Sequence, residues 1–280
     1  MRVVNLDGRA SLLVGDAAID LAAASGGRFG PDLASVYEQW AAVREFAADI
    51  DGSAATPFDV KRLGAPSPEP RQVFAIGMNY RAHAEEAGLP VPSIPATFTK
   101  YPTCIVGPDG DVALPSGSVD WEVELVVIVG AYAHRVAEAE AWSFVAGLTI
   151  GQDLSERVVQ FGAGAQFALG KSFPGFGPMG PALVTADELD NPDDLALGCS
   201  INGETVQDAR TSDLVFSVAQ LVAELSAVVP LLPGDVIFTG TPSGIGATRQ
   251  PPRFLQPGDL LETWIEGLGR MQHRLVGADA

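Results

Sequence analysis

The first residues that could do chemistry are two glutamates at the front of an apolar stretch. In "VDWEVELVVIVG" (119–130), Glu122 and Glu124 stand two residues apart and lead into a nearly unbroken apolar run. Side chains of a strand alternate between faces, so the two carboxylates point the same way. Like charges on one face of a buried strand repel each other and resist the loss of water. Either they lie at an exposed strand end, or a divalent cation holds them together.

Such a cation would need a third oxygen ligand, and Asp153 is the candidate. It closes an apolar strand and opens an expected helix in "GLTIGQDLSERVVQ" (147–160). Carboxylate oxygens are hard ligands that suit Mg²⁺, Mn²⁺ or Ca²⁺ rather than zinc. The same position would also suit a helix N-cap, and the spacing leaves ligation and capping equally open.

A second cluster lies in "GMNYRAHAEEAG" (77–88), where His83 and Glu86 stand three residues apart. On a helix they share a face, and a carboxylate beside a histidine orients the ring and raises its basicity, as a general base requires. The alternative is an ordinary exposed helix with solvated glutamates. Lys171 lies in a loop of Gly and Pro, "LGKSFPGFGPMGP", where a lone lysine is usually solvated.

Composition and glycine patterns exclude several function classes. The net charge is −18, which disfavours nucleic acid and gives no support for an anionic membrane surface. "GAGAQF" (162–167) lacks the third glycine of a dinucleotide fingerprint, and "GTPSGIG" (240–246) lacks the lysine of a phosphate loop. We therefore reject nucleotide binding. The two cysteines match no zinc or disulfide pattern, and no signal peptide or membrane span is evident. We expect a cytoplasmic protein.

The elements that must position these residues are mostly short strands. Residues 1–66 are expected to form a small N-terminal α/β domain, with strands in "RVVNLDG" and "ASLLVGD" and helices in 16–25 and 32–50, the second capped by Asp32. Residues 67–280 are expected to form the larger, catalytic domain. It contains strands in "VFAIGMNY", "GPDGDVALP", "PGDVIFTG" and "PGDLLETWIEG", and one helix in "SDLVFSVAQLVAELSAVV". Regular βαβ alternation is absent, so we predict a strand-rich α+β fold of mixed sheets.

Taken in order, these pieces resemble the fumarylacetoacetate hydrolase family, in its branch of acylpyruvate hydrolases and 2-hydroxyhepta-2,4-diene-1,7-dioate isomerases. The resemblance covers about residues 70 to 275 and runs through "GMNYRAHAEE", "PTCIVGPDGDVALP", "VDWEVELVVIVG", "GQDLSERVVQ", "GKSFPGFGPMGP", "INGETVQDARTSDLVFS" and "PGDVIFTGTPSGIG". The ordered set is highly specific, although no single piece is.

The resemblance implies a mixed β-roll, usually a homodimer, and a set of site residues. It implies Mg²⁺ or Mn²⁺ held by Glu122, Glu124 and Asp153, and a His83–Glu86 dyad on a mobile lid that closes over substrate. Matching family positions that face or contact the substrate are Arg157, Gln160, Lys171 and Thr241. The segment 161–169, "FGAGAQFAL", departs from the commoner family pattern.

The resemblance also implies chemistry on 2-oxo acids and their enols, with stabilisation of an enolate as the shared requirement. Our first hypothesis is a metal-dependent hydrolase that cleaves the carbon–carbon bond of an acylpyruvate-like 2,4-dioxo acid. The alternatives are an oxaloacetate-type decarboxylase, a 5-carboxymethyl-2-hydroxymuconate-type isomerase, and a non-catalytic metabolite-binding protein. The intact set of carboxylates, dyad and lysine speaks against the last.

The positions of the basic side chains indicate a small anionic substrate. Arg157 and Lys171 follow Asp153 in sequence, and Arg81 and Lys100 bracket the expected lid in a chain with only 17 basic residues. Such a concentration is what capture of a small carboxylate needs. We expect a 2-oxo carboxylate head at the metal and a tail that is set by the lid and the segment 161–169.

Overall fold

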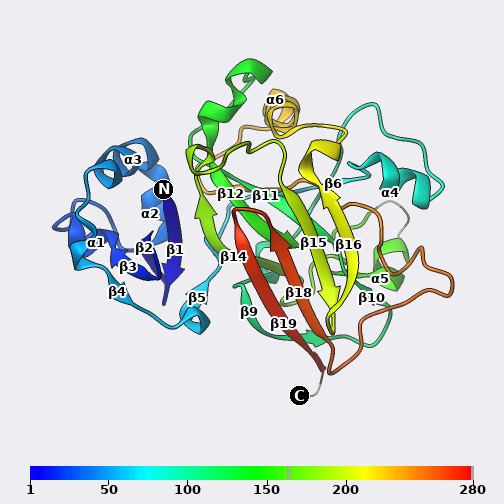
Figure 1. The fold of residues 1–280 in the computed structure, drawn as a ribbon. Coiled ribbons are helices and arrows are strands. Elements are labelled where there is room, and N and C mark those ends of the chain that lie inside the picture. The colour runs from blue at the N-terminus through cyan, green and yellow to red at the C-terminus, as the bar shows by residue number, and fades with distance from the viewer. Residues whose placement is uncertain (163, 165, 279–280) are drawn as a thin grey trace.

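Three β-sheets dominate the chain, whose computed structural model describes residues 1–162, 164 and 166–278 (Figure 1). They contain twelve, five and two strands, and both parallel and antiparallel pairs occur. The prediction of a strand-rich α+β fold with mixed sheets is therefore confirmed.

The largest sheet places its most buried strands at the carboxylates. Its order is β4 (Thr56–Pro57), β3 (Ala17–Asp20), β2 (Arg9–Val14), β1 (Arg2–Leu6), β14 (Gly177–Val184), β12 (Val145–Gln152), β11 (Val123–Val129), β17 (Val236–Phe238), β6 (Val73–Gly77) and β7 (Ala96–Thr99), and β5 (Leu63–Gly64) and β8 (Ile105–Val106) pair with β1 and β14. Every residue of β11 and β12 is buried. Both faces of β11 and β12 are covered by other parts of the protein. Their sequences are therefore continuously apolar, without the alternation of polar and apolar residues that is typical of a half-exposed strand.

A second sheet packs against the first through one apolar cluster. Its order is β16 (Glu204–Arg210), β15 (Ala196–Ile201), β18 (Leu260–Ile265), β19 (Gly269–Gly277) and β9 (Asp109–Leu114). Leu125 and Val127 of β11 share this cluster with Leu197 of β15 and Leu261 of β18. The two short strands β10 (Val119–Asp120) and β13 (Ser155–Glu156) pair beside the carboxylates. Layers of this kind bury the apolar faces of both sheets.

Helices and 3₁₀ turns connect the strands. The helices are α1 (Leu21–Ala24), α2 (Leu33–Glu38), α3 (Trp40–Ala48), α4 (Arg81–Glu86), α5 (Arg157–Gly162) and α6 (Val218–Val228), and 3₁₀ turns occupy Gly52–Ala54, Val60–Arg62, Pro102–Cys104, Glu138–Phe144, Ala186–Glu188 and Thr211–Asp213. The predicted helix at α6 is confirmed, and Ser217 begins it with a capping box. The strands expected in the larger part of the chain are confirmed as β6, β9, β17 and β18.

Two expectations in the N-terminal part need correction. Residues 16–25 were expected to be one helix, but Ala17–Asp20 form β3 and only Leu21–Ala24 are helical. A two-residue hairpin with Gly15 at positive φ pairs β3 with β2, and this pairing overrides the helix propensity of alanine. The helix expected at 32–50 starts at its predicted cap, Asp32, but breaks at Gln39 into α2 and α3.

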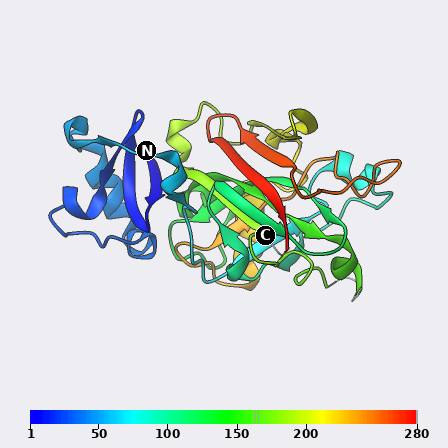
Figure 2. The ribbon, with the colours of Figure 1, turned by 90° about the horizontal axis from the view of Figure 1, so that it is seen from below.

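Residues 1–66 form a lobe beside the body in both ribbon views (Figures 1 and 2). The lobe is joined to the body by hydrogen bonds, because β1 pairs antiparallel with β14 at Arg2–Val184 and Val3–Leu183. That this lobe is a domain of its own stays a prediction.

Both cysteines are buried and free, as expected. Within the described residues, no helix has the length and apolar character that crossing a membrane requires.

One titratable side chain is enclosed in the five-stranded sheet. His273 of β19 is 1% exposed, and its Nε2 lies 3.0 Å from the carbonyl oxygen of Gly107. A carbonyl only accepts, so Nε2 carries the hydrogen, and no described residue offers a partner to Nδ1. Burial lowers the pKa of His273 below its ordinary value.

Candidate metal centre and active site

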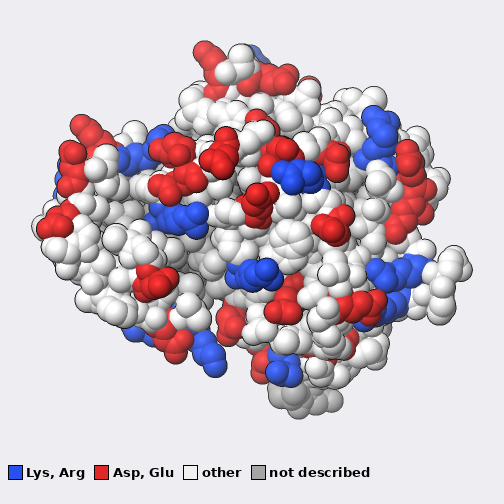
Figure 3. Space-filling view, viewed as in Figure 1, with Lys and Arg blue, Asp and Glu red and all other residues white. Residues whose placement is uncertain are grey.

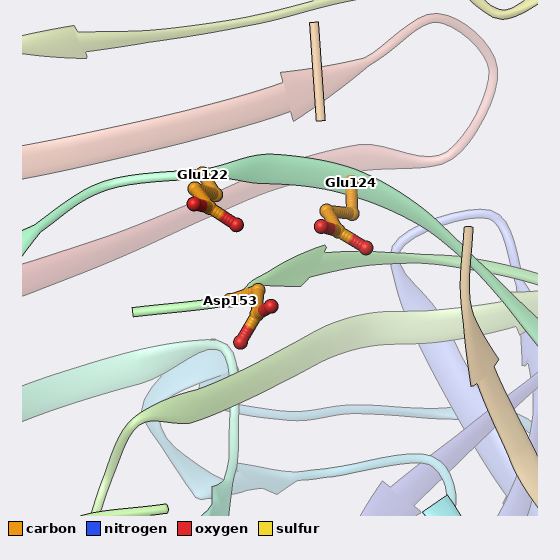
Figure 4. Close-up of side chains that lie close together, drawn as sticks. All are labelled: Glu122, Glu124 and Asp153. Carbon is orange, nitrogen blue, oxygen red and sulfur yellow. The ribbon is translucent and has the colours of Figure 1, made fainter. Parts of the chain in front are cut away.

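Glu122, Glu124 and Asp153 meet where β11 begins and β12 ends (Figure 4). The two strands are antiparallel, with Val123 opposite Gln152, and the backbone N–H of Asp153 donates to the carbonyl of Glu122 at 2.9 Å. Each side chain offers an oxygen within 4.8 Å of the others, and all three are at least 95% buried. The alternative of an exposed strand end is therefore wrong.

Asp153 does not serve as a helix cap. Its two carboxylate oxygens accept hydrogen bonds from the ammonium groups of Lys100 and Lys171, each at 2.6 Å. The first turn of α5 is capped instead by Glu156, whose carboxylate accepts from the backbone N–H groups of Val158 at 3.3 Å and Val159 at 2.7 Å. The side chain of Asp153 therefore does not cap α5, and it lies beside the other two carboxylates.

Lys171 is buried among the acidic groups rather than solvated. Its Nζ lies 2.6 Å from Oε2 of Glu122 and 2.6 Å from Oδ2 of Asp153, and the residue is 3% exposed. Lys100 is fully buried and also donates to the carbonyl oxygen of Lys171. The sequence placed Lys100 only at the edge of the expected lid, and its pairing with Asp153 was missed.

The pKa values of the two glutamates are shifted in opposite directions. Burial would raise the pKa of Glu122, but the charges of Lys171 and Arg157 outweigh it and lower that pKa to about 2. The pKa of Glu124 is raised by burial and by the negative charges of Asp153 and Glu122. Glu124 also accepts a hydrogen bond from the backbone N–H of Gly240 at 2.8 Å. Burial and its acidic neighbours thus favour the protonated form of Glu124. A divalent cation would offset both effects and so would stabilise the ionised form of Glu124 most.

The donor set therefore fits a hard divalent ion. Three carboxylates can supply oxygen ligands and leave coordination positions for water or substrate. The ionisable side chains that gather at this centre are the acidic Asp120, Glu122, Glu124 and Asp153 and the basic Lys100, Arg157 and Lys171. One divalent ion would change the balance of this group from net negative to net positive, which suits an anionic substrate.

The predicted dyad lies beside the same centre. His83 is 5% exposed, its Nδ1 lies 3.5 Å from Oε2 of Glu86, and the loop whose Gly240 contacts Glu124 also contacts Glu86 through Gly244. Burial would raise the pKa of Glu86, but hydrogen bonds from His83, Thr248 and Gly244 outweigh it and lower that pKa. The backbone N–H of Gly244 reaches both oxygens of Glu86 at 3.1 Å. The exposed-helix alternative is wrong for His83, although motion of the lid stays a prediction.

The other expected substrate residues are buried and already bonded to protein groups. Arg157 donates through Nη2 to Glu122 at 2.8 Å and through Nη1 to Gln160 at 2.8 Å. Thr241 accepts from Nε2 of Gln207 at 2.8 Å and follows Gly240 in the loop that touches Glu124. The structure brings Arg157 and Gln160 beside a metal carboxylate, and their contact with substrate stays a prediction.

Asp120 is a further member that sequence reasoning missed. It is fully buried and pairs with Arg157 at 2.7 Å. A signal was present in the sequence, because Asp120 stands two residues before Glu122, as Glu122 does before Glu124, and one continuous strand would place all three on one face. In the structure the strand is interrupted between β10 and β11.

An aromatic group borders the lysine side of the centre. The ring of Phe98 lies 5.1 Å from Nζ of Lys171, and Phe167 lies 5.8 Å from Phe98 and 5.7 Å from Phe161. Within the segment 161–169 that was expected to shape the substrate tail, residues 163 and 165 lie outside the described residues. The role of this segment therefore stays a prediction.

The comparisons with known proteins agree with this geometry. Oxaloacetate tautomerase FAHD2A, mitochondrial, from Homo sapiens is 44% identical over 215 residues, which are 76% of this chain and 68% of that protein. A crystal structure of what is called a "putative HpcE protein" from Mycobacterium smegmatis is 54% identical, with a TM-score of 0.96 and 100% of both chains covered. Maleylpyruvate hydrolase from Sphingobium sp., solved with manganese(II) and pyruvate, is 28% identical, with a TM-score of 0.82 and 99% of both chains covered.

A match to a protein family completes these comparisons. Residues 72–276 match the family described as Fumarylacetoacetate (FAA) hydrolase C-terminal, which spans the body of the fold and every residue of the centre. The mixed sheets and the buried acidic triad predicted from the sequence agree with that match. The chain belongs to the fumarylacetoacetate hydrolase family.

Proposed function

We propose that this enzyme is a divalent-metal-dependent hydrolase that cleaves the carbon–carbon bond of an acylpyruvate-like 2,4-dioxo acid. The observation that carries the proposal is the meeting of three carboxylates and the ammonium of Lys171 at one buried centre. The buried imidazole of His83, which pairs with the more exposed Glu86, supplies the base of the proposed reaction. A 2-oxo acid presents adjacent carboxylate and carbonyl oxygens, which match a site that combines oxygen ligands with fixed positive charge.

The proposed metal residues are Glu122, Glu124 and Asp153, for which we expect Mg²⁺ or Mn²⁺. When bound, the ion would supply Lewis-acid stabilisation of negative charge on the oxygens of the 2-oxo acid head. Lys171 would bind the same head, because its ammonium is fixed between Glu122 and Asp153. That a related maleylpyruvate hydrolase was solved with manganese(II) and pyruvate supports this choice of metal and head group.

The dyad would perform the proton transfer. Nδ1 of His83 faces Glu86, which leaves Nε2 as the atom that takes a proton from a water molecule attacking the distal ketone. Glu86 is itself held by the backbone N–H of Gly244, so it would fix the orientation and tautomer of the ring. The proposed roles of Arg157, Gln160 and Thr241 are to orient the substrate from the surrounding wall.

A second candidate is tautomerisation of oxaloacetate, which moves a proton between carbon and oxygen and breaks no carbon–carbon bond. The observation that favours it is the 44% identity to an oxaloacetate tautomerase. Decarboxylation of oxaloacetate and isomerisation of a hydroxymuconate would use the same head group and stay alternatives. A non-catalytic binding protein is the least supported, because it would not require a buried base beside the carboxylates.

A substrate panel tests these proposals. Acylpyruvates, oxaloacetate in its enol and keto forms, and a hydroxymuconate are assayed with Mg²⁺, with Mn²⁺ and after chelation. We expect metal-dependent release of pyruvate from an acylpyruvate, and no turnover of esters or amides that lack the 2-oxo acid head. Faster enol–keto conversion of oxaloacetate without pyruvate release would favour the second candidate. A neutral ester as best substrate would refute both.

We also propose that the protein is a homodimer and acts in the cytoplasm on a small anionic substrate, without nucleic acid or membrane partners. On the face in Figure 3, acidic and basic side chains are interspersed rather than gathered into a broad basic patch, which accords with the net charge of −18. Size-exclusion chromatography with light scattering would test the oligomeric state. A monomer at micromolar concentration would contradict the proposed homodimer.

A further inference from the structure

Asp120 is a buried carboxylate that the proposed reaction does not use. It lies in β10, two residues before Glu122, and is 0% exposed. Its Oδ1 accepts from the backbone N–H of Gly246 at 2.7 Å, and its Oδ2 accepts from the backbone N–H of Ala247 at 2.9 Å. Two backbone donors from one loop thus fix the carboxylate in place. A buried charge that is held in this way is positioned for a partner.

That partner is Arg157, which Asp120 shares with Glu122. Oδ2 of Asp120 accepts from Nη2 of Arg157 at 2.7 Å and from Nε at 3.0 Å. The same Nη2 lies 2.8 Å from Oε1 of Glu122. The guanidinium of Arg157 therefore binds two carboxylates at once. One is Asp120, which is held by backbone N–H groups, and the other is Glu122, a candidate metal ligand. A cation that binds both must divide its attraction between them.

We propose that Asp120 is a positioning residue that holds Arg157 and so leaves Glu122 able to ligate the metal. Without the charge of Asp120, Arg157 would retain Glu122 as its single carboxylate partner and would compete with the ion for it. The inference rests on the metal site of the proposed function. It adds that the affinity of this site depends on a carboxylate that touches neither ion nor substrate.

The test compares Mn²⁺ affinity, measured by electron paramagnetic resonance of the free ion, across matched variants. Asp120→Asn should bind Mn²⁺ about 10-fold more weakly, the lower end of effects seen when a partner of a metal ligand is lost. The double variant Asp120→Asn/Arg157→Gln removes the competing cation, and its Mn²⁺ affinity should return to within about threefold of the wild type. Changing Asp120 and Arg157 together also avoids leaving either of them as an unpaired buried charge, which is the more destabilising case.

The control is Asp235→Asn. Asp235 is also fully buried and accepts backbone hydrogen bonds from Gln72 at 2.9 Å and Leu232 at 2.8 Å, but none of its hydrogen bonds involves the metal centre. The Asp235→Asn protein should be less stable to heat than the wild type, while its Mn²⁺ affinity should equal that of the wild type. A general loosening of the protein would instead weaken Mn²⁺ binding in both variants and would overturn the inference.

The outcomes separate this inference from the proposed function. A wild-type chain that does not bind Mn²⁺ refutes the metal site itself. If the wild type binds and Asp120→Asn binds equally well, only the inference fails. If Asp120→Asn does not fold, the double variant decides, because a loss of Mn²⁺ affinity beyond about 10-fold there would show that Asp120 does not act through Arg157.

Discussion

Replacement of Lys171 by methionine should separate metal binding from turnover, because its ammonium competes with the ion and also assists the substrate. Nζ makes two charge-assisted hydrogen bonds of 2.6 Å, to Glu122 and Asp153. Each such bond contributes about 1.5–3 kcal/mol. If an entering ion displaces one of them, its binding is opposed by that amount, which corresponds to roughly 10-fold to 100-fold in affinity. Methionine keeps the length of the side chain and removes the competitor.

We therefore expect Lys171→Met to bind Mn²⁺ at least about 10-fold more tightly, while kcat/KM at saturating Mn²⁺ falls about 100-fold, as for loss of one oxyanion donor. Without metal the variant should be less stable by about 3–5 kcal/mol, since two buried carboxylates lose a counter-charge, and Mn²⁺ should restore part of that loss.

The assay combines titration with Mn²⁺, steady-state kinetics and urea unfolding with and without the ion. Lys61→Met is the control, because Lys61 is exposed and none of its ion pairs belongs to this centre. Weaker Mn²⁺ binding by Lys171→Met together with an unchanged kcat/KM would refute the assignment of the ammonium to both tasks.

Three further predictions concern the triad, the dyad and a buried histidine. Glu124→Ala should abolish Mn²⁺ binding and turnover while the far-ultraviolet circular dichroism stays unchanged, and a variant that binds Mn²⁺ normally would contradict the ligand assignment. His83→Ala should lower the rate of acylpyruvate hydrolysis by about 100-fold or more and leave Mn²⁺ affinity unchanged, and wild-type hydrolysis in that variant would exclude the base. His273 has a pKa below the ordinary value of about 6.5, so the unfolded chain takes up a proton that the folded chain excludes, and stability should fall as the pH drops below about 6.5. His273→Gln should flatten the dependence of Tm on pH in that range, whereas the exposed-site control His134→Gln should keep the wild-type slope; equal slopes in all three proteins would contradict the argument.

The sequence predicted the acidic part of the centre because its geometry is local. A strand period of two is enough to place Glu122 and Glu124 on one face, and a helical period is enough to join His83 to Glu86. The assignment of Asp153 needed only that one strand begins where its antiparallel neighbour ends. The roles of these residues in turnover stay predictions.

The cationic part could not be predicted in the same way, because its pairs are distant in sequence. Lys100 meets Asp153 across 53 residues, and Asp120 meets Arg157 across 37. No periodicity encodes such contacts, which depend on how the sheets pack. The error at residues 16–25 has the same origin, since an alanine-rich run became a strand when β2 offered it a partner.

The pairing of β1 with β14 bears on how the protein could be dissected. β14 is bonded on one side to β1 and on the other to β12, which ends at the carboxylate cluster. A fragment limited to residues 72–276, the part that matches the family, would leave the backbone of β14 open along the side that β1 now covers. Open strand edges recruit other chains, so such a fragment would be prone to aggregate. The first residues of the chain thus act as a cover for the sheet that carries the metal ligands, whatever else the N-terminal lobe does.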